Sequence, residues 1–101
     1  MREITPIELH SLLQQQPVFL LDVREPHEHE AFHLGGQLIP LDDVMSNAQQ
    51  IPKDQMVVVY CKKGIRSQIA IQRLEQKFGL TNLVNLTGGV EAWRKQLLIN
   101  N

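Results

Sequence analysis

The sequence predicts a single α/β domain with a mostly parallel sheet and helices on both faces. Two short apolar runs, 18–23 and 56–60, are rich in branched residues and do not alternate with polar ones. This pattern is typical of strands buried on both faces of a parallel sheet. Stretches with the periodicity of a helix lie between these two apolar runs and after the second one. Strands that alternate with helices in this way are typical of one parallel sheet with right-handed crossovers. A chain of 101 residues, 43% of them hydrophobic, has room for one core, so one domain over 1–101 is expected.

The first helix is predicted to begin at Pro6. Thr5 and Glu8 have the spacing of a capping box, and proline is favoured at the first position of a helix. Pro17 is expected to end this helix before the first strand. A second helix is predicted over 40–50, ending before Pro52.

The helix predicted over 67–78 has the clearest pattern. Its apolar residues recur at helical spacing: Ala70, Ile71, Leu74 and Phe78. Gly79 stands where a C-terminal cap is expected. A short strand over 83–86, a turn at Gly88-Gly89 and a last helix over 90–97 complete the chain.

Composition and charge exclude several classes of protein. Residues 1–55 carry nine acidic and three basic side chains, and residues 56–101 carry two and seven. The basic residues are not interleaved with aromatic ones and the pI is 6.4, so no nucleic-acid partner is expected. No apolar run approaches a signal peptide or a membrane span, and one cysteine forms no internal disulfide. A cytoplasmic protein without a membrane partner is expected.

The functional residues are expected in the segment 60–67 (YCKKGIRS), around the single cysteine, Cys61. A short loop leads there from the carboxyl end of a predicted parallel strand into a helix N-terminus. Ligands bind at this edge of parallel sheets, and the free amides of such a loop converge into an anion site. Gly64 gives the loop backbone freedom. Three cations surround it: Lys62, Lys63 and Arg66.

This environment predicts that Cys61 is a nucleophile. The converging amides, the helix dipole and the cations all favour the thiolate, and we expect the sulfur to be largely ionised near neutral pH and open to solvent. A lone cysteine at a strand end is, by itself, more often a small buried hydrophobic residue. The combination of strand, cysteine, cations, glycine and helix favours catalysis over that alternative.

With these features the chain resembles the single-domain rhodaneses, a family of sulfurtransferases. The family's active loop, Cys-x-x-Gly-x-Arg-Ser, matches residues 61–67. An upstream Asp-Val-Arg-Glu matches residues 22–25, and a closing Gly-Gly-x-x-Ala-Trp matches residues 88–93. Three motifs in the right order and spacing form a specific signal, and the resemblance covers nearly the whole chain.

The resemblance implies a rhodanese-like fold with a five-stranded sheet, and sulfur transfer without a metal or an organic cofactor. Cys61 would take the sulfane sulfur of a small anionic donor such as thiosulfate and carry it as a persulfide. It would then pass that sulfur to an external acceptor, a thiol or cyanide. The loop would bind the substrate and hold the persulfide's charge through its residues Lys62, Lys63, Gly64, Ile65 and Arg66.

Other residues are expected to support the loop. Asp22 and Arg24, at the end of a predicted strand, are expected to form structural ion pairs rather than to touch the substrate. Ser67 is expected to be the N-cap of the following helix. Arg66 either binds the anion or pairs with an acidic residue, for which the candidates are Asp22, Glu25 and Glu28.

The segment 32–37 (FHLGGQ) departs from the family. Many members read Gly-His-Ile-Pro-Gly-Ala here, and the segment up to Ile39-Pro40 is one residue shorter in this chain. The family pattern therefore does not predict the conformation of this rim loop or its part in substrate choice.

Two alternative functions share the fold. Related phosphatases and arsenate reductases place five residues between the cysteine and the arginine, whereas four separate Cys61 from Arg66. The tighter loop suits a single sulfur atom, so a phosphatase-like enzyme is the weaker alternative. Rhodanese-like domains that have lost the cysteine serve as non-catalytic binding or regulatory modules, and the presence of Cys61 argues against that role.

Residues 29–33 (HEAFH) match the H-E-x-x-H pattern of zinc proteases, in which two histidines on one helix face bind the metal. A helix here would stop at Gly35, and the one histidine outside this cluster, His10, is upstream. We therefore expect a charged surface turn and no metal site. Adventitious metal would be trapped by His27, His29 and His33.

Overall fold

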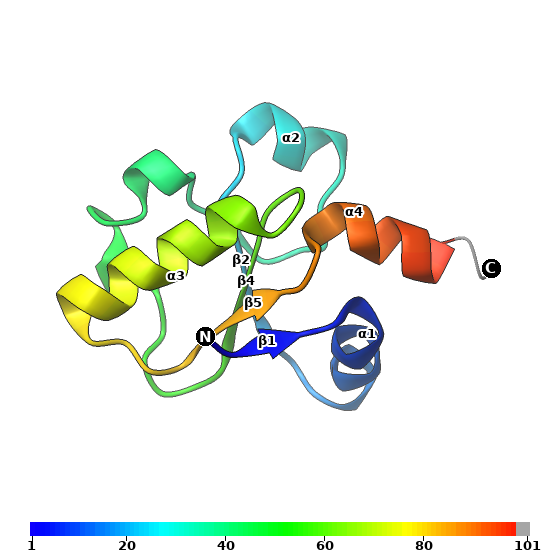
Figure 1. Ribbon diagram of the computed structural model, residues 1–101, viewed down its shortest axis with the longest axis horizontal. Helices are drawn as coiled ribbons and strands as arrows, with labels where there is room; N and C mark the ends of the chain where they lie inside the picture. The colour runs from blue at the N-terminus through cyan, green and yellow to red at the C-terminus, as the bar shows by residue number, and fades with distance from the viewer. Residues whose placement is uncertain (99–101) are drawn as a thin grey trace.

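Five parallel strands form the sheet at the centre of the structure (Figure 1). In chain order they are β1 (Glu3–Ile4), β2 (Phe19–Asp22), β3 (Gln37–Leu38), β4 (Val57–Tyr60) and β5 (Leu83–Leu86). Across the sheet the order is β1-β5-β4-β2-β3, and every neighbouring pair is parallel. The computed structural model describes residues 1–98, so the end of the predicted domain, 99–101, lies outside the described residues. The predicted α/β class with a five-stranded sheet is confirmed.

The central strand β4 shows why an apolar run without alternation belongs here. Val57 and Val59 lie in the core on one face of the sheet, and Val58 and Tyr60 lie in the core on the other. Because successive side chains of a strand point to opposite faces, a strand covered on both sides needs apolar residues at every position. All four residues of β4 are fully buried.

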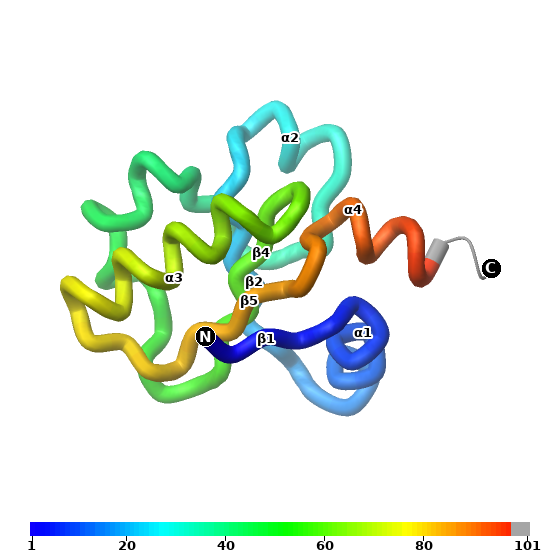
Figure 2. Tube along the Cα trace, viewed as in Figure 1, coloured from blue at the N-terminus to red at the C-terminus, as the bar shows by residue number. Residues whose placement is uncertain are grey.

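Helices cover both faces of this sheet (Figures 1 and 2). One face packs against α1 (Pro6–Gln15) and α4 (Gly89–Trp93), which a π-helical segment, Arg94–Leu98, prolongs. The other face packs against α3 (Ile65–Phe78) and two 3-10 segments, Leu41–Asp43 and Ala48–Gln50. The short helix α2 (Pro26–Ala31) follows the carboxyl end of β2. No helix within residues 1–98 is long and apolar enough to cross a bilayer.

Two predicted helix signals are confirmed. At the start of α1, the Thr5 hydroxyl accepts from the Glu8 amide at 3.1 Å, and the Glu8 carboxylate accepts from the Thr5 amide at 2.9 Å. At the end of α3, Gly79 is the C-cap, with a φ of 66°. A left-handed conformation at this position explains why glycine stands there.

The prediction of a helix over 40–50 is wrong, because the segment contains only the two 3-10 segments. The side chains of Ser46 and Asn47 bond to the Asp43 carbonyl oxygen, at 3.1 and 2.8 Å. Such side chains compete with the backbone ladder of an α-helix. The last helix also differs from the regular helix predicted over 90–97. Its α-helical part ends at Trp93, and the π-helical segment Arg94–Leu98 follows.

Candidate active site

Cys61 is the first residue after β4 and opens the loop that leads into α3. The residue is 1% exposed, so the expectation of a sulfur open to solvent is wrong. Cys61 nevertheless lines a pocket of about 140 Å³. The other residues that line this sulfur pocket are Lys62, Lys63, Ile65 and Arg66.

The N-terminus of α3 is directed at the sulfur. The Cys61 Sγ accepts from the Gly64 amide at 3.1 Å and from the Ser67 amide at 3.4 Å. Within residues 1–98 these are the backbone amides that bond to Sγ, so those of Lys62, Lys63, Ile65 and Arg66 do not reach it directly. Two amide donors from the first turn of α3 and its N-cap therefore converge on the Cys61 sulfur.

The prediction that Ser67 caps α3 is wrong. The N-cap is Gly64, whose φ of 94° turns the chain into the helix two residues earlier than predicted, and Ser67 is the third helical residue. The Ser67 amide would usually bond to the side-chain oxygen of a capping residue. Here it bonds to the Cys61 Sγ, so the sulfur takes the place of the capping oxygen.

A hydrogen-bond chain leads from the buried sulfur to exposed Glu3 on the edge strand β1. The Ser67 Oγ lies 3.4 Å from the Cys61 Sγ and donates to the Asn85 Oδ1, and the Asn85 Nδ2 donates to the Glu3 carboxylate at 3.1 Å. Because a carboxylate only accepts, it fixes the orientation of the Asn85 amide, and the Ser67 proton points away from the sulfur. The sequence patterns do not predict Asn85 as a residue of this site. Its signal was one polar residue within the apolar run 83–86, where a buried amide needs partners.

The loop after Cys61 is also fixed to α4. The Val90 amide donates to the Cys61 carbonyl oxygen and the Glu91 amide donates to that of Lys62, both at 2.9 Å. Gly89 permits this approach, because a Cβ there would lie 2.4 Å from the Cys61 carbonyl oxygen. The first turn of α4 is therefore bonded directly to the loop that carries the cysteine.

Asp22 and Arg24 form a buried ion pair at the carboxyl end of β2. Asp22 Oδ1 accepts from the Arg24 Nε at 2.9 Å, and Oδ2 accepts from Arg24 Nη2 at 2.8 Å. His29 Nδ1 lies 2.9 Å from the same Oδ2, and Arg24 Nη2 also donates to the Phe32 carbonyl oxygen at 2.7 Å. Burial by itself would raise the pKa of Asp22, but the hydrogen bonds from Arg24 and His29 outweigh it and hold that pKa below its ordinary value.

Tyr60 anchors the rim loop 32–37. Its hydroxyl donates to the Gly35 carbonyl oxygen at 3.0 Å and accepts from the Leu34 amide at 3.2 Å. Burial, together with the charge of Asp22, raises the pKa of Tyr60 to about 12, so the hydroxyl keeps its proton for this bond at neutral pH. Gly36 has a φ of 86° and lies so close to Leu20 that a Cβ would collide with its backbone. Gly36, which matches the glycine of the family pattern, thus lets this loop pass close to β2, whereas Gly35, which stands in place of the family's proline, has open space around it.

Arg66 pairs with Glu28, one of the three candidates. The contact is bidentate, with Nη1 to Oε1 at 2.7 Å and Nη2 to Oε2 at 2.9 Å. The hydrogen bonds from Arg66 outweigh desolvation and lower the pKa of Glu28 from 4.5 to about 2. Arg66 therefore joins α3 to α2 across the rim of the sulfur pocket.

Glu28→Gln is expected to lower the free energy of unfolding by about 1 kcal/mol at neutral pH, because the Arg66 side chain is one third exposed and solvent weakens the pair. The folded-state pKa lies below the unfolded one. The contribution is therefore complete above about pH 4.5 and is lost as the pH falls toward 2. Urea unfolding should therefore show that the free energies of unfolding of the native protein and of Glu28→Gln differ less at pH 3 than at pH 7.

The matched control is Glu30→Gln, an exposed residue of the same helix that forms no ion pair within residues 1–98. Its effect should stay within about 0.5 kcal/mol at both pH values. A Glu28→Gln effect that did not change with pH would contradict an ionic contribution.

The H-E-x-x-H stretch does not have the geometry of a zinc protease. α2 ends at Ala31, so His33 lies beyond the helix, and the rings of His29 and His33 stack with their centres 4.1 Å apart. His29 is bonded to Asp22, and His33 Nδ1 accepts from the Gly35 amide at 2.9 Å. No group of three or more potential ligands converges on a metal position anywhere within residues 1–98.

Comparisons with known proteins agree with this architecture. The family model of the rhodanese-like domain matches residues 5–96. The probable adenylyltransferase/sulfurtransferase MoeZ of Mycobacterium tuberculosis is 40% identical over 98 residues, which are 93% of this chain and 25% of MoeZ. The chain thus spans about a quarter of the length of that relative.

Solved structures of similar size have the same fold. A rhodanese-like domain protein from Staphylococcus aureus superimposes with a TM-score of 0.82 at 33% identity, over 92% of this chain and 91% of the other. The human single-domain sulfurtransferase TSTD1 gives a TM-score of 0.78 at 26% identity, over 95% and 97%. Because the family model spans nearly the whole chain and relatives of this kind share its fold from end to end, the chain belongs to the rhodanese-like family.

Proposed function

We propose that this protein is a sulfurtransferase that carries a sulfane sulfur as a persulfide on Cys61. The donor is thiosulfate or a similar small anion, and the acceptor is an external thiol or cyanide. The observation that carries the proposal is the placement of the Cys61 Sγ, which accepts two amides at the N-terminus of α3, beside a small pocket that Cys61 lines together with Lys62 and Lys63. Family membership and the sulfurtransferase names of MoeZ and TSTD1 support it.

The proposed reaction has two displacements. The Cys61 thiolate attacks the outer sulfur of thiosulfate, the bond between the two donor sulfurs breaks, and sulfite leaves with the electron pair. The acceptor then attacks the outer sulfur of the persulfide and returns Cys61 to the thiolate. The amides of Gly64 and Ser67 stabilise negative charge on Sγ in both steps, as donors do in an oxyanion hole. With one cysteine in the chain, the acceptor comes from outside it.

The mass of the intact protein after thiosulfate treatment tests the proposal. The native chain should gain one sulfur atom and lose it on addition of cyanide, whereas Cys61→Ser should gain none. Serine keeps the size of the side chain but is a much weaker nucleophile. The sulfurtransferase assignment would be contradicted if the native chain gained no sulfur, or if Cys61→Ser gained as much sulfur as the native chain.

The lysines at the pocket provide a second prediction. The double variant Lys62→Ala/Lys63→Ala should raise the KM for thiosulfate by about tenfold with a smaller change in kcat, because these cations attract the donor rather than react with it. The effect should shrink at high salt, where exposed charges are screened. The matched control is Lys53→Ala/Lys77→Ala, which removes two exposed lysines away from the sulfur pocket. Equal KM values in the two double variants would mean that Lys62 and Lys63 are surface charge only.

The geometry does not favour a phosphatase. Both terminal nitrogens of Arg66 are bonded to Glu28, so they are not free to bind a phosphate group on the Cys61 sulfur. Turnover of a chromogenic phosphate ester that depended on Cys61 would overturn this ranking.

A further inference from the structure

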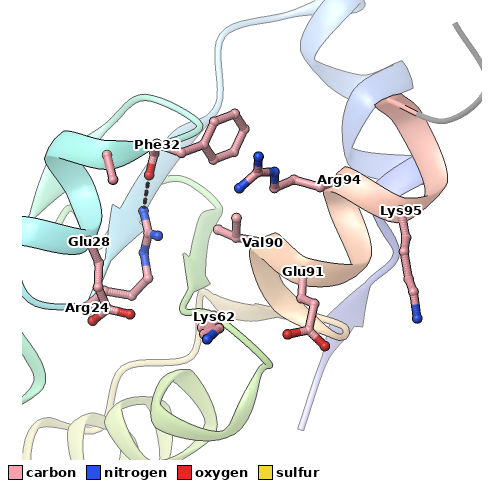
Figure 3. Close-up of a pocket in the computed structure, with 9 residues that line it drawn as sticks. Arg24, Glu28, Phe32, Lys62, Val90, Glu91, Arg94 and Lys95 are labelled. Carbon is pink, nitrogen blue, oxygen red and sulfur yellow. Dashed lines mark hydrogen bonds between the residues drawn. The ribbon is translucent and has the colours of Figure 1, made fainter.

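A larger cavity of about 550 Å³ lies beside the sulfur pocket, between the end of α2 and α4 (Figure 3). Part of its lining is apolar: Ala31, Phe32 and Val90. The rest is charged: Arg24, Glu28, Lys62, Glu91, Arg94 and Lys95. We call this cavity the α2–α4 cleft.

The α2–α4 cleft and the sulfur pocket adjoin. Lys62 lines both cavities, and the Arg66–Glu28 ion pair joins a residue of the sulfur pocket to a residue of the cleft. The amides of Val90 and Glu91 are bonded to the carbonyl oxygens of Cys61 and Lys62, so the α4 wall of the cleft is fixed to the cysteine loop. The two cavities therefore share one residue, Lys62, which directly follows the cysteine.

The charges of the cleft favour an anion. Two of its charged residues are neutralised by partners outside it, Arg24 by Asp22 and Glu28 by Arg66. The remaining ones are Lys62, Glu91, Arg94 and Lys95, all exposed, and none of the three cations forms an ion pair within residues 1–98. The Arg94 guanidinium lies over the Phe32 ring, 4.7 Å from its centre (Figure 3). The cleft thus combines an apolar wall with an excess of positive charge at its edge.

The size of the cleft is that of a site for an organic molecule, since such sites typically measure about 300–1,000 Å³. Thiosulfate and cyanide would leave most of it empty. Resting on the proposed function, we infer that the cleft binds the body of the sulfur acceptor, a small organic thiol that carries a carboxylate. Its apolar part packs on Phe32 and Val90, its carboxylate meets Arg94, and its sulfur enters the pocket of Cys61.

The transfer needs no further reagent. The acceptor thiolate attacks the outer sulfur of the Cys61 persulfide, and a new S–S bond forms as the bond to the Cys61 Sγ breaks. The electron pair of that bond stays on Sγ, and the organic persulfide leaves with the proton that the protein persulfide carried. The sulfane sulfur keeps its oxidation state, so no oxidant or reductant takes part.

The test compares two acceptors that share an aromatic ring and a thiol, 4-mercaptophenylacetate and its methyl ester. The protein is first loaded with thiosulfate, its mass is checked, and the discharge of the persulfide is followed at increasing acceptor concentration. The second-order rate constant should be about tenfold higher for the acid than for the ester, because only the acid forms a charge-assisted contact with Arg94. Arg94→Gln should reduce this ratio by about threefold or more, and Arg94→Lys, which keeps the charge but loses the guanidinium stacked on Phe32, should keep only part of it.

The matched control is Arg73→Gln, an exposed arginine of α3 that does not line the cleft, and it should keep the native ratio. Equal rate constants for acid and ester in the native protein, or an unchanged ratio in Arg94→Gln, would overturn the assignment of the cleft while the persulfide chemistry stood. A protein that gains no sulfur before any acceptor is added would overturn the proposed function, and this inference with it.

Discussion

Gly89→Ala is expected to lower the free energy of unfolding by about 3 kcal/mol and to slow the loading of Cys61 with sulfur severely. Gly89 has a φ of 64°, where a side chain is strained, and a Cβ would lie 2.4 Å from the Cys61 carbonyl oxygen and 2.6 Å from the Lys62 carbonyl carbon. Both close atoms belong to backbone, which no rotamer change can move aside. The substitution must therefore push α4 away from the loop or shift the loop itself.

The matched control is Gly79→Ala, at the C-cap of α3. Its φ of 66° is nearly the same, but a Cβ there would have no atom within 4 Å. The strain of a left-handed backbone alone should cost about 1 kcal/mol, with no effect on sulfur loading. Urea unfolding and the mass after thiosulfate should be measured for both variants. Equal losses of stability would show that the approach of α4 to the loop does not require glycine.

The sequence predicts most of the framework of this site because that framework rests on local chemistry. The run MVVVY is apolar at every position, and only a strand covered on both faces needs that. The capping box at Thr5 and the glycine after Phe78 define helix ends within a few residues of chain. The position of Cys61 at the carboxyl end of β4, before the N-terminus of α3, follows from these elements.

The features that sequence patterns do not reveal depend on contacts between distant segments. β1 and β3 have two residues each, which is too few for a periodic pattern. They form because β1 pairs with β5 and β3 pairs with β2. α3 begins two residues before its predicted start, because Gly64 turns the chain early and the Cys61 sulfur, not a hydroxyl, accepts the hydrogen bond of the Ser67 amide. The burial of Cys61 depends on packing around the loop, which no local pattern encodes.

The acidic partner of Arg66 is another feature that the sequence does not predict. Three acidic residues were candidates, and nothing in the order of residues distinguishes Glu28 from the other two. The choice follows from α2, whose first turn directs Glu28 toward α3, while Asp22 is already occupied by Arg24 and His29. The α2–α4 cleft likewise forms only when two helices from distant parts of the chain meet the cysteine loop.

Asp22→Asn is expected to lower the free energy of unfolding by about 3 kcal/mol or more, since it leaves Arg24, which is 4% exposed, as a buried cation without its counter-charge. Asparagine has the same shape, so the loss measures the charge rather than a cavity. The control is Asp42→Asn, an exposed aspartate on a 3-10 segment, which should change stability by less than about 0.5 kcal/mol. Chemical unfolding at neutral pH supplies both values.

The double variant Asp22→Asn/Arg24→Met separates the two explanations for that loss. If the unpaired charge of Arg24 is the cause, removing it should recover stability, and the double variant should be more stable than Asp22→Asn alone. The recovery should be incomplete, because Arg24 also donates to the Phe32 carbonyl oxygen and lies 5.6 Å from the centre of the Tyr60 ring. If the double variant is no more stable than Asp22→Asn, the loss of stability comes from the hydrogen bonds of Asp22 itself. These bonds hold His29 and the turn from β2 into α2 beside the sulfur pocket.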